Sequence, residues 1–139
     1  MKVLSLLQPW ASLVVLGYKQ IETRGWNTEH RGDLLIHASS GRKGKLVTSA
    51  PPFTRYIPDF EKLPFGAIIG KVQLTDVFRF TTEDLFDPQL AKLSMEEKAF
   101  GDYAPGRYGW VLEDPEIFAD PIPAKGSLRL WDFDTPDGL

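Results

Sequence analysis

The chain has 139 residues, of which 42% are hydrophobic and 25% charged, and its formal net charge is −3. This length and composition predict a single globular domain over residues 1–139 with its own hydrophobic core, and they exclude collagen-like, coiled-coil and wholly disordered chains. The sequence contains no cysteine, which excludes disulfides, zinc–thiolate sites and iron–sulfur clusters, and we expect neither a metal nor a cofactor.

The N-terminal segment predicts an apolar strand followed by a short helix. Val3 to Leu7 is β-compatible, and Pro9 fits the first turn of a helix, where its missing N–H is not needed. Spacings of three and four predict one buried helical stripe ending at a glycine, formed by Trp10, Leu13, Val14 and Gly17. Because no apolar run reaches ~18 residues, we expect no membrane span. Pro9 breaks the N-terminal apolar stretch, which we therefore interpret as part of the fold and not as a signal peptide, and we expect a cytoplasmic location.

Two extended segments follow this helix. Lys19 to Trp26 alternates apolar with charged positions, and Asp33 to Ala38 is a strongly β-like run, with a turn at Arg31-Gly32 between them. The polar, glycine-containing stretch from Ser39 to Lys45 predicts a loop that opens into another helix.

The longest strand signal runs from Gly66 to Phe80, after a proline-interrupted stretch around Pro51-Pro52 and Pro58. Gly70 within this strand predicts a bulge or bend. Simple alternation divides the strand into two sides, Ile69, Lys71, Gln73 and Thr75 on one and Ile68, Val72 and Leu74 on the other.

The C-terminal part predicts further helical material and two strands. Thr81 to Lys98 is helical in character, with Thr82 as its N-cap and Pro88 as an interruption. Arg107 to Glu113 and Gly126 to Phe133 are the two late strand signals.

Five or six short strands, with helices inserted after the first strand, after Ala38 and after Phe80, suit an α+β fold. We therefore predict a small, mostly antiparallel β-barrel with helices packed outside it. The sequence shows no βαβ alternation and no glycine-rich phosphate fingerprint, which argues against a doubly wound sheet.

Charge is divided unevenly along the chain. Residues 1–71 hold ten basic and five acidic side chains, a balance of +5, whereas residues 72–139 hold six basic and fourteen acidic ones, a balance of −8. Such a division is typical of a basic surface that attracts an anion or a nucleic acid, or else of charges that coat solvated faces without any pattern in space.

The densest polar cluster lies in GYKQIETRGW, residues 17–26, which contains Lys19, Glu22 and Arg24. A straight strand would point Lys19 away from the other two, but a bend at the helix exit would bring all three together. Arginine offers a planar fork for phosphate or a base edge, lysine a point charge, and glutamate an acceptor for an exocyclic amine. The structural alternative is a Glu22–Arg24 ion pair that closes one end of the barrel, with Lys19 in solvent.

Further candidates have a functional and a structural interpretation each. Trp26 follows the charged cluster and is placed to stack on a base, although tryptophan in the core is the commoner case. His37 lies in an apolar run, where a core or rim histidine is more usual than a ligand. Ser39 offers a hydroxyl to an anion, and the basic loop with Arg42 and Lys43 either contacts phosphates or is simply solvated.

The N-terminal third resembles the signature of ASCH domains. The matching elements are Gln8-Pro9-Trp10-Ala11, the GxKxxExR string of Gly17, Lys19, Glu22 and Arg24, then Trp26, Arg31-Gly32 and Ile36-His37-Ala38. The later strands look like the remaining strands of that family, so the resemblance covers nearly the whole chain. It implies a PUA-like β-barrel with a nucleic-acid-binding cleft beside the first helix, lined by the GxKxxExR segment. Through this resemblance Gln8 and Arg31 join the predicted binding residues.

One branch of the family consists of small amidohydrolases that act on N4-acylated cytidines, with a lysine, a threonine and a glutamate proposed as catalytic. Lys19 matches the lysine, but Glu22 stands where that branch has threonine. Some relatives have also been proposed as ribonucleases, and no motif of this chain matches their residues.

Three functions follow, ranked in order. The first is a binding module for RNA or a modified nucleoside, with DNA as a further candidate. The second is a small hydrolase, in which Lys19 would be nucleophile or general base and Glu22 the proton shuttle. The third is a protein–protein adaptor that uses the acidic half.

Overall fold

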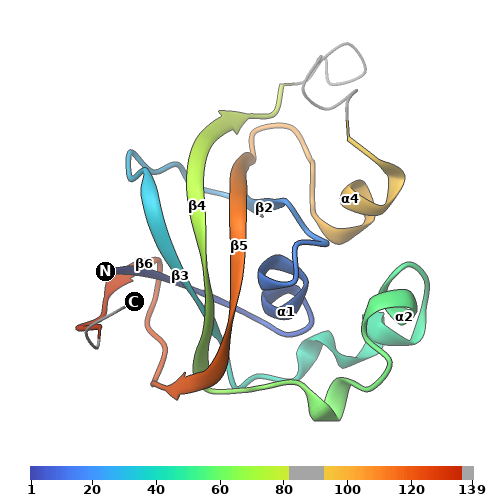
Figure 1. Cartoon of the computed structure of the whole chain (residues 1–139). Coiled ribbons are helices and arrows are strands. Elements are labelled where there is room, and N and C mark those ends of the chain that lie inside the picture. Colours follow the sequence, from blue (N-terminus) through green and yellow to red (C-terminus); the bar gives the residue numbers. More distant parts are fainter. Residues whose placement is uncertain (82–92, 136–139) are drawn as a thin grey trace.

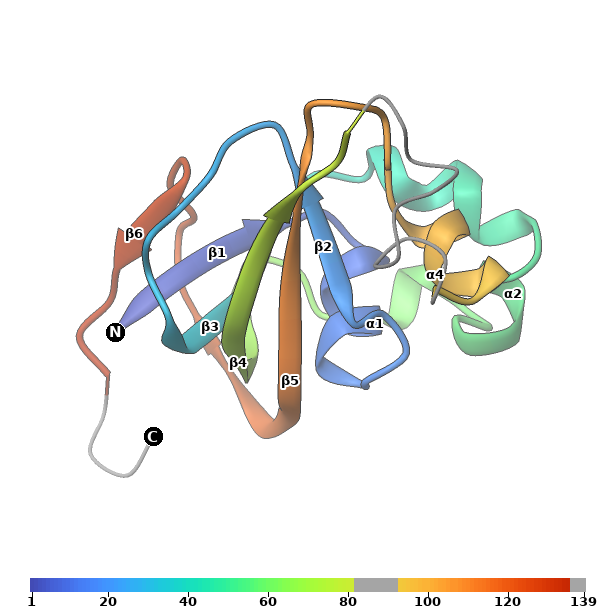
Figure 2. The ribbon, with the colours of Figure 1, turned by 90° about the horizontal axis from the view of Figure 1, so that it is seen from above.

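The structure of the chain, a computed structural model, describes residues 1–81 and 93–135. A six-stranded sheet with the order β2-β5-β4-β3-β1-β6 forms its centre (Figure 1). The β1–β3 pair is parallel and the other four strand pairs are antiparallel. The sheet is curled into a half-barrel (Figure 2), which confirms the predicted α+β, mostly antiparallel PUA-like fold. Its strands are β1 (Lys2–Leu6), β2 (Ile21–Arg24), β3 (Gly32–Ala38), β4 (Ala67–Arg79), β5 (Tyr108–Pro123) and β6 (Leu130–Asp132).

Short helices form a layer beside the sheet. They are α1 (Trp10–Val15), α2 (Phe53–Tyr56), α4 (Met95–Phe100) and the 3-10 helices η1 (Lys43–Ser49) and η2 (Phe60–Lys62). Figure 1 shows α1 between the sheet and the pair α2 and α4. The predicted helix after Ala38 is therefore present, but as three short pieces, η1, α2 and η2.

The helix α1 follows Pro9 and ends before Gly17, whose φ of +86° favours glycine, so both predicted boundaries are confirmed. The prediction of a single buried stripe is wrong. Val14 packs into the core cluster of the sheet, whereas Leu13 packs with Phe53 and other residues of the helical layer. Because α1 lies between two apolar layers, it is buried almost all round.

The bulge predicted at Gly70 is present, and it overturns the simple alternation along β4. The register with β3 and β5 shifts at this point, so that Ile69 joins Val72 in the main core cluster while Ile68 faces a second cluster. A Cβ atom on Gly70 would lie 2.3 Å from the carbonyl oxygen of Glu116. Only glycine permits this approach of the two backbones.

The late strands differ from their predicted lengths. β5 continues ten residues past the predicted end at Glu113, because its C-terminal part pairs with β4 alone and its other edge is free to hold Pro115 and Pro121. β6 covers three residues of the predicted Gly126 to Phe133.

Of the helical material predicted from Thr81 to Lys98, the described residues contain the part within α4, which begins at Met95 and ends at Phe100; Ser94 caps α4 by accepting a hydrogen bond from the Glu97 amide. Thr82 and Pro88 lie outside the described residues. Among the residues that the structure describes, no helix is long and apolar enough to cross a membrane.

Candidate functional site

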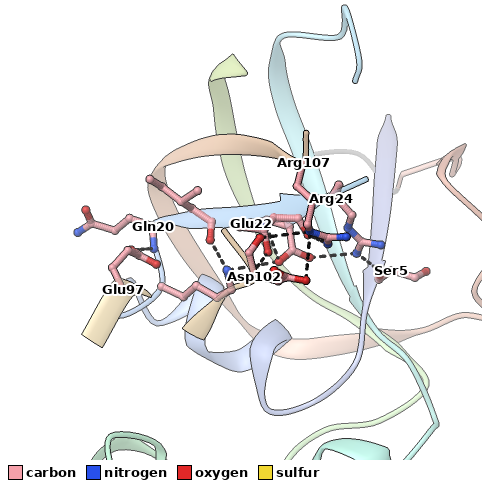
Figure 3. A network of polar contacts seen from close by, with 10 residues as sticks. Ser5, Gln20, Glu22, Arg24, Glu97, Asp102 and Arg107 are labelled. Atoms are coloured by element: carbon pink, nitrogen blue, oxygen red, sulfur yellow. Dashed lines mark hydrogen bonds and ion pairs between the residues drawn. The ribbon is translucent and has the colours of Figure 1, made fainter. Parts of the chain in front are cut away.

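Lys19, Glu22 and Arg24 converge, as the sequence predicts for a bend at the helix exit. The strand β2 begins at Ile21, so Lys19 lies in the turn before it and is free of strand alternation. Glu22 Oε1 is 3.3 Å from Lys19 Nζ, and Glu22 Oε2 is 3.0 Å from Arg24 Nη2 (Figure 3). One carboxylate therefore forms ion pairs with two cations, at the strand that lies at the edge of the sheet.

Lys19 is the most deeply buried member of this cluster, with no exposed side-chain surface. Its ammonium group donates to the carbonyl oxygen of Ile21 as well as contacting Glu22. It lines a small cavity of about 240 Å³ beside α1 and β5, separate from the cleft described next. The alternative of a solvated Lys19 is thus wrong, although the Glu22–Arg24 ion pair is present.

A cleft of about 570 Å³, here called the first cleft, lies between β1, β2 and the helical layer. Trp10, Phe53 and Phe100 give it an apolar wall, while Glu22 and Arg24 lie at its polar end. The remaining lining residues are Ser5, Leu6, Leu7, Thr23, Ser39, Val47, Ala99, Gly101, Asp102 and Arg107. An apolar wall with a few convergent polar groups is the usual form of a small-molecule site.

Two guanidinium groups are fixed at the polar end of the first cleft (Figure 3). Arg24 Nη2 donates to the carbonyl oxygen of Ser5 at 3.0 Å, and its Nε is buried without a hydrogen-bond partner. Arg107 Nη2 donates to the carbonyl oxygen of Thr23 at 3.3 Å, and its Nε is 3.5 Å from Asp102 Oδ2. The side chain of Arg24 is 26% exposed, so it remains accessible from the cleft.

Glu97 of α4 is a neighbour of this cluster that the sequence analysis missed. Its Oε1 accepts a 2.6 Å hydrogen bond from the Gln20 amide, while its Oε2 is buried without a partner. Burial raises the pKa of Glu97, against the opposing effects of the Gln20 amide and of Lys19. The spacing Ser94-x-x-Glu97 is that of a capping box. From the sequence alone, Glu97 would therefore be assigned a structural role at the start of a helix.

Tyr103 lies close to these carboxylates. Its hydroxyl is buried without a hydrogen-bond partner in the described part of the chain. Burial raises the pKa of Tyr103, and the charges of Glu97 and Glu22 add to the effect. A buried polar cluster thus extends behind the first cleft.

Gln8 and Arg31 lie outside the first cleft. Gln8 is fully buried, where its amide donates to Ser12 Oγ and the carbonyl oxygen of Pro64, and its Oε1 accepts from the Ser12 amide. Gln8 therefore holds the start of α1. Arg31 is exposed and donates to the carbonyl oxygens of Thr28 and His30 in its own loop.

Trp26 packs edge-on against Trp110 at 4.8 Å between ring centroids, and the guanidinium of Arg129 covers its ring at 4.2 Å. One face of the Trp26 ring is thus already covered by the Arg129 guanidinium in a cation–π contact. His37 is almost fully buried and lines a different cleft.

The basic loop is partly neutralised. Arg42 and Lys45 both contact Glu61, at 2.9 Å and 2.8 Å, and Arg42 also lies over the Phe65 ring. A hydrogen bond from Lys45 lowers the pKa of Glu61, which burial partly opposes. Lys43 is exposed and does not line the first cleft. Of the predicted binding residues, the first cleft gathers Glu22, Arg24 and Ser39, with Lys19 behind them.

The fold and the site together define a class of protein. A curled, mostly antiparallel half-barrel with a polar cleft beside its first helix is a PUA-like domain. The model of the family described as "ASCH domain" matches residues 4–120, and the chain belongs to this family.

Relatives of known identity agree with this assignment. Activating signal cointegrator 1 of Mus musculus and that of Homo sapiens are each 30% identical over 138 residues, which covers 95% of this chain and 22% of each relative. The chain thus spans about a fifth of the length of these relatives.

Solved structures show the same fold. The crystal structure of ASCH from Zymomonas mobilis has a TM-score of 0.52 at 18% identity, covering 88% of this chain and 72% of that chain. A point mutant of the same protein has a TM-score of 0.54 at 18% identity, covering 88% and 74%. At this identity the likeness concerns the fold.

Proposed function

We propose that this chain binds RNA, or a modified nucleoside, in the first cleft. The observation that carries this proposal is the state of Arg24, a guanidinium that Glu22 and the Ser5 carbonyl hold in place and that stays 26% exposed at the polar end of the first cleft. A guanidinium that is held in place and still partly exposed has N–H donors left for a ligand acceptor, and hydrogen bonds from a charged donor are among the stronger ones in proteins. Membership of the ASCH family, which is commonly RNA-binding, supports the same conclusion.

Each wall of the first cleft has a role in this proposal. The rings of Trp10, Phe53 and Phe100 provide apolar surface for a base or ribose. Glu22 accepts a hydrogen bond from an exocyclic amine, as carboxylates do with cytosine N4. Arg24 donates to a base edge or to a phosphate oxygen.

The charges of the first cleft are balanced, with two carboxylates, Glu22 and Asp102, and two guanidiniums, Arg24 and Arg107. Binding of the phosphate backbone by electrostatic attraction alone would instead need an excess of cations in the cleft. This balance supports recognition of the base as a main part of binding.

The test is a binding titration, followed by tryptophan fluorescence, with single-stranded RNA, single-stranded DNA, the four nucleosides and N4-acetylcytidine. We expect the wild type to bind at least one of them, and Arg24→Ala to lose at least tenfold in affinity, since a hydrogen bond to a charged group contributes about 1.5–3 kcal/mol. Arg79→Ala is the matched control, because Arg79 is an exposed guanidinium at the end of β4 that does not line the first cleft.

Thermal unfolding of each variant separates lost binding from lost structure. Absence of binding to every ligand at low salt would contradict the proposal. Equal affinities of wild type and folded Arg24→Ala would do so as well.

Hydrolysis is the alternative function. It needs a neutral amine that faces the substrate, whereas Lys19 contacts Glu22 and the Ile21 carbonyl and lines a separate cavity. These contacts favour binding over hydrolysis. Turnover of N4-acetylcytidine or RNA by the wild type, lost in a folded Lys19→Met variant, would establish the hydrolase instead.

A further inference from the structure

A second cleft of about 550 Å³ adjoins the first one. It shares Ser5 and Ser39 with the first cleft, so the two openings meet at these small side chains. Its other lining residues are His37, Ser40, Gly66, Ala124, Lys125, Gly126, Ser127 and Leu128.

One wall of the second cleft is the link between β5 and β6, and His37 anchors this link. His37 Nε2 lies 2.7 Å from the carbonyl oxygen of Ala124 and must donate to it, because a carbonyl oxygen only accepts. In the neutral ring Nδ1 then accepts from the hydroxyl of Ser5 at 3.0 Å, and Ser5 Oγ accepts from Trp131 Nε1 at 3.1 Å. His37 is therefore fully hydrogen-bonded, so its role is to position the link and not to contact a ligand.

The anchoring extends to the neighbouring backbone. The Ala124 amide donates to the carbonyl oxygen of Gly66 at 3.1 Å. A Cβ atom on Gly126 would lie 2.8 Å from His37 Cε1 and 2.9 Å from Ser5 Oγ, so the link lies directly on the His37–Ser5 pair. The part of the link that carries Lys125 and Ser127 thus starts from a fixed point.

The chemistry of the second cleft differs from that of the first. Its polar side chains are Lys125, the serines and His37, whose two ring nitrogens are already hydrogen-bonded, and no carboxylate is among the described residues that line it. An ammonium with several hydroxyls is a typical donor set for a phosphate group. The first cleft, with its aromatic wall and balanced charges, suits a base.

We propose that the two clefts form one groove for consecutive units of a single-stranded RNA, with a base in the first cleft and the adjoining phosphodiester in the second. Ser5 and Ser39, which line both clefts, join the two parts of this groove. This inference rests on the proposed function and narrows it, because its ligand is an oligonucleotide of at least two residues and not a free nucleoside.

The experiment is a ladder of ligands measured by isothermal titration calorimetry. For each base, the ladder contains the nucleoside, its 5′- and 3′-monophosphates, the homodinucleotide and the homotetranucleotide. We expect affinity to rise at the monophosphate that fills the second cleft and to rise again at the dinucleotide. The preferred monophosphate gives the direction of the strand.

Lys125→Ala tests the second cleft directly. We expect it to weaken dinucleotide binding about fivefold, to leave nucleoside binding unchanged, and to reduce the slope of log K against log salt by about 0.7, the share of one phosphate contact on a single strand. Lys62→Ala is the matched control, since Lys62 is exposed on η2 and lines neither cleft.

The outcomes separate the two proposals. Equal affinity for nucleoside and dinucleotide, with no effect of Lys125→Ala, would overturn the two-unit groove and leave the first cleft as the binding site. Tighter dinucleotide binding that Lys125→Ala leaves unchanged would also overturn it, because the phosphate would then lie elsewhere. Failure of every ligand to bind would reject the proposed function and this inference with it.

Discussion

Glu22 contacts two cations, and the buried charge of Lys19 depends on it. The Lys19 side chain has no exposed surface, and its contacts in the described structure are Glu22 and the Ile21 carbonyl. The carboxylate of Glu22, by contrast, would keep Arg24 and the Thr23 amide if Lys19 were lost. Loss of Glu22 should therefore destabilise the folded chain more than loss of Lys19.

We predict that Glu22→Gln lowers the free energy of unfolding by about 3 kcal/mol, because it removes the ion-pair partner of a buried ammonium. Lys19→Met removes the buried charge itself and should lower it by less than about 2 kcal/mol. Urea unfolding measures the free energy of unfolding of both variants and of the wild type. Lys2→Met, which breaks the exposed pair with Asp132, is the control and should change stability by less than about 1 kcal/mol. A larger loss for Lys19→Met than for Glu22→Gln would show that another group neutralises Lys19.

Glu97 predicts a pH dependence of stability. Burial raises the pKa of Glu97 in the folded chain above that of the unfolded chain. Its contribution to stability is thus fully present below the unfolded pKa and is lost as the pH rises through the folded pKa. We expect Glu97→Gln, which keeps an oxygen for the Gln20 amide, to lose less stability than the wild type between about pH 4 and pH 7. Parallel stability curves for the two proteins, from urea unfolding across this range, would refute the prediction.

At the scale of elements, the bulge at Gly70 decides which side chains of β4 enter the main core. Gly70→Ala would press a methyl group against the Glu116 carbonyl and Val15. We expect a loss of about 2–3 kcal/mol in the free energy of unfolding, typical of overpacking. Gly25→Ala is the control, because its Cβ would meet its nearest neighbour at 3.7 Å. A Gly70→Ala variant as stable as Gly25→Ala would mean that the two strands separate easily.

The same strand shows how far element prediction could go. Gly70 marked the bulge correctly, yet the sides of Ile68 and Ile69 could not be read from alternation, because an extra residue reverses the pattern at that point. In β5 the predicted strand ended at Glu113, whereas the structure continues it through Pro115 and Pro121, because the edge beside these prolines is unpaired.

At the scale of the whole molecule, the two oppositely charged halves of the sequence do not become two faces. Ion pairs join the basic first half to the acidic second half, namely Lys2–Asp132, Arg55–Glu96 and Lys71–Glu116. Within the first half, Glu61 neutralises part of the basic loop. The simpler interpretation of the charge division, that charges coat solvated faces, therefore fits these contacts.

This distribution predicts a shallow salt dependence of RNA binding. Three cations line the two clefts, Arg24, Arg107 and Lys125. If each contacted one phosphate, log K would fall against log salt with a slope of about −2 for a single strand. RNA titrations at several salt concentrations measure this slope. A slope of −4 or steeper would show that further basic residues, such as those of the loop around Arg42, contact the strand.

The sequence by itself determined the α+β class of fold through its pattern of strands and helices, and the ends of α1 and the bulge at Gly70 through proline and glycine. It left the meeting of Lys19, Glu22 and Arg24 conditional on a bend at the helix exit, and the structure contains that bend. The tertiary structure decided which member of that cluster reaches the cleft. Burial between α1 and β5 removes Lys19 from it, and the end of β2 leaves Arg24 partly exposed. It also brought Glu97 to the Gln20 amide, and Lys125 to the lining of the second cleft, from distant segments of the chain. Spacing along a chain carries no information on such long-range contacts, since they depend on how whole elements pack.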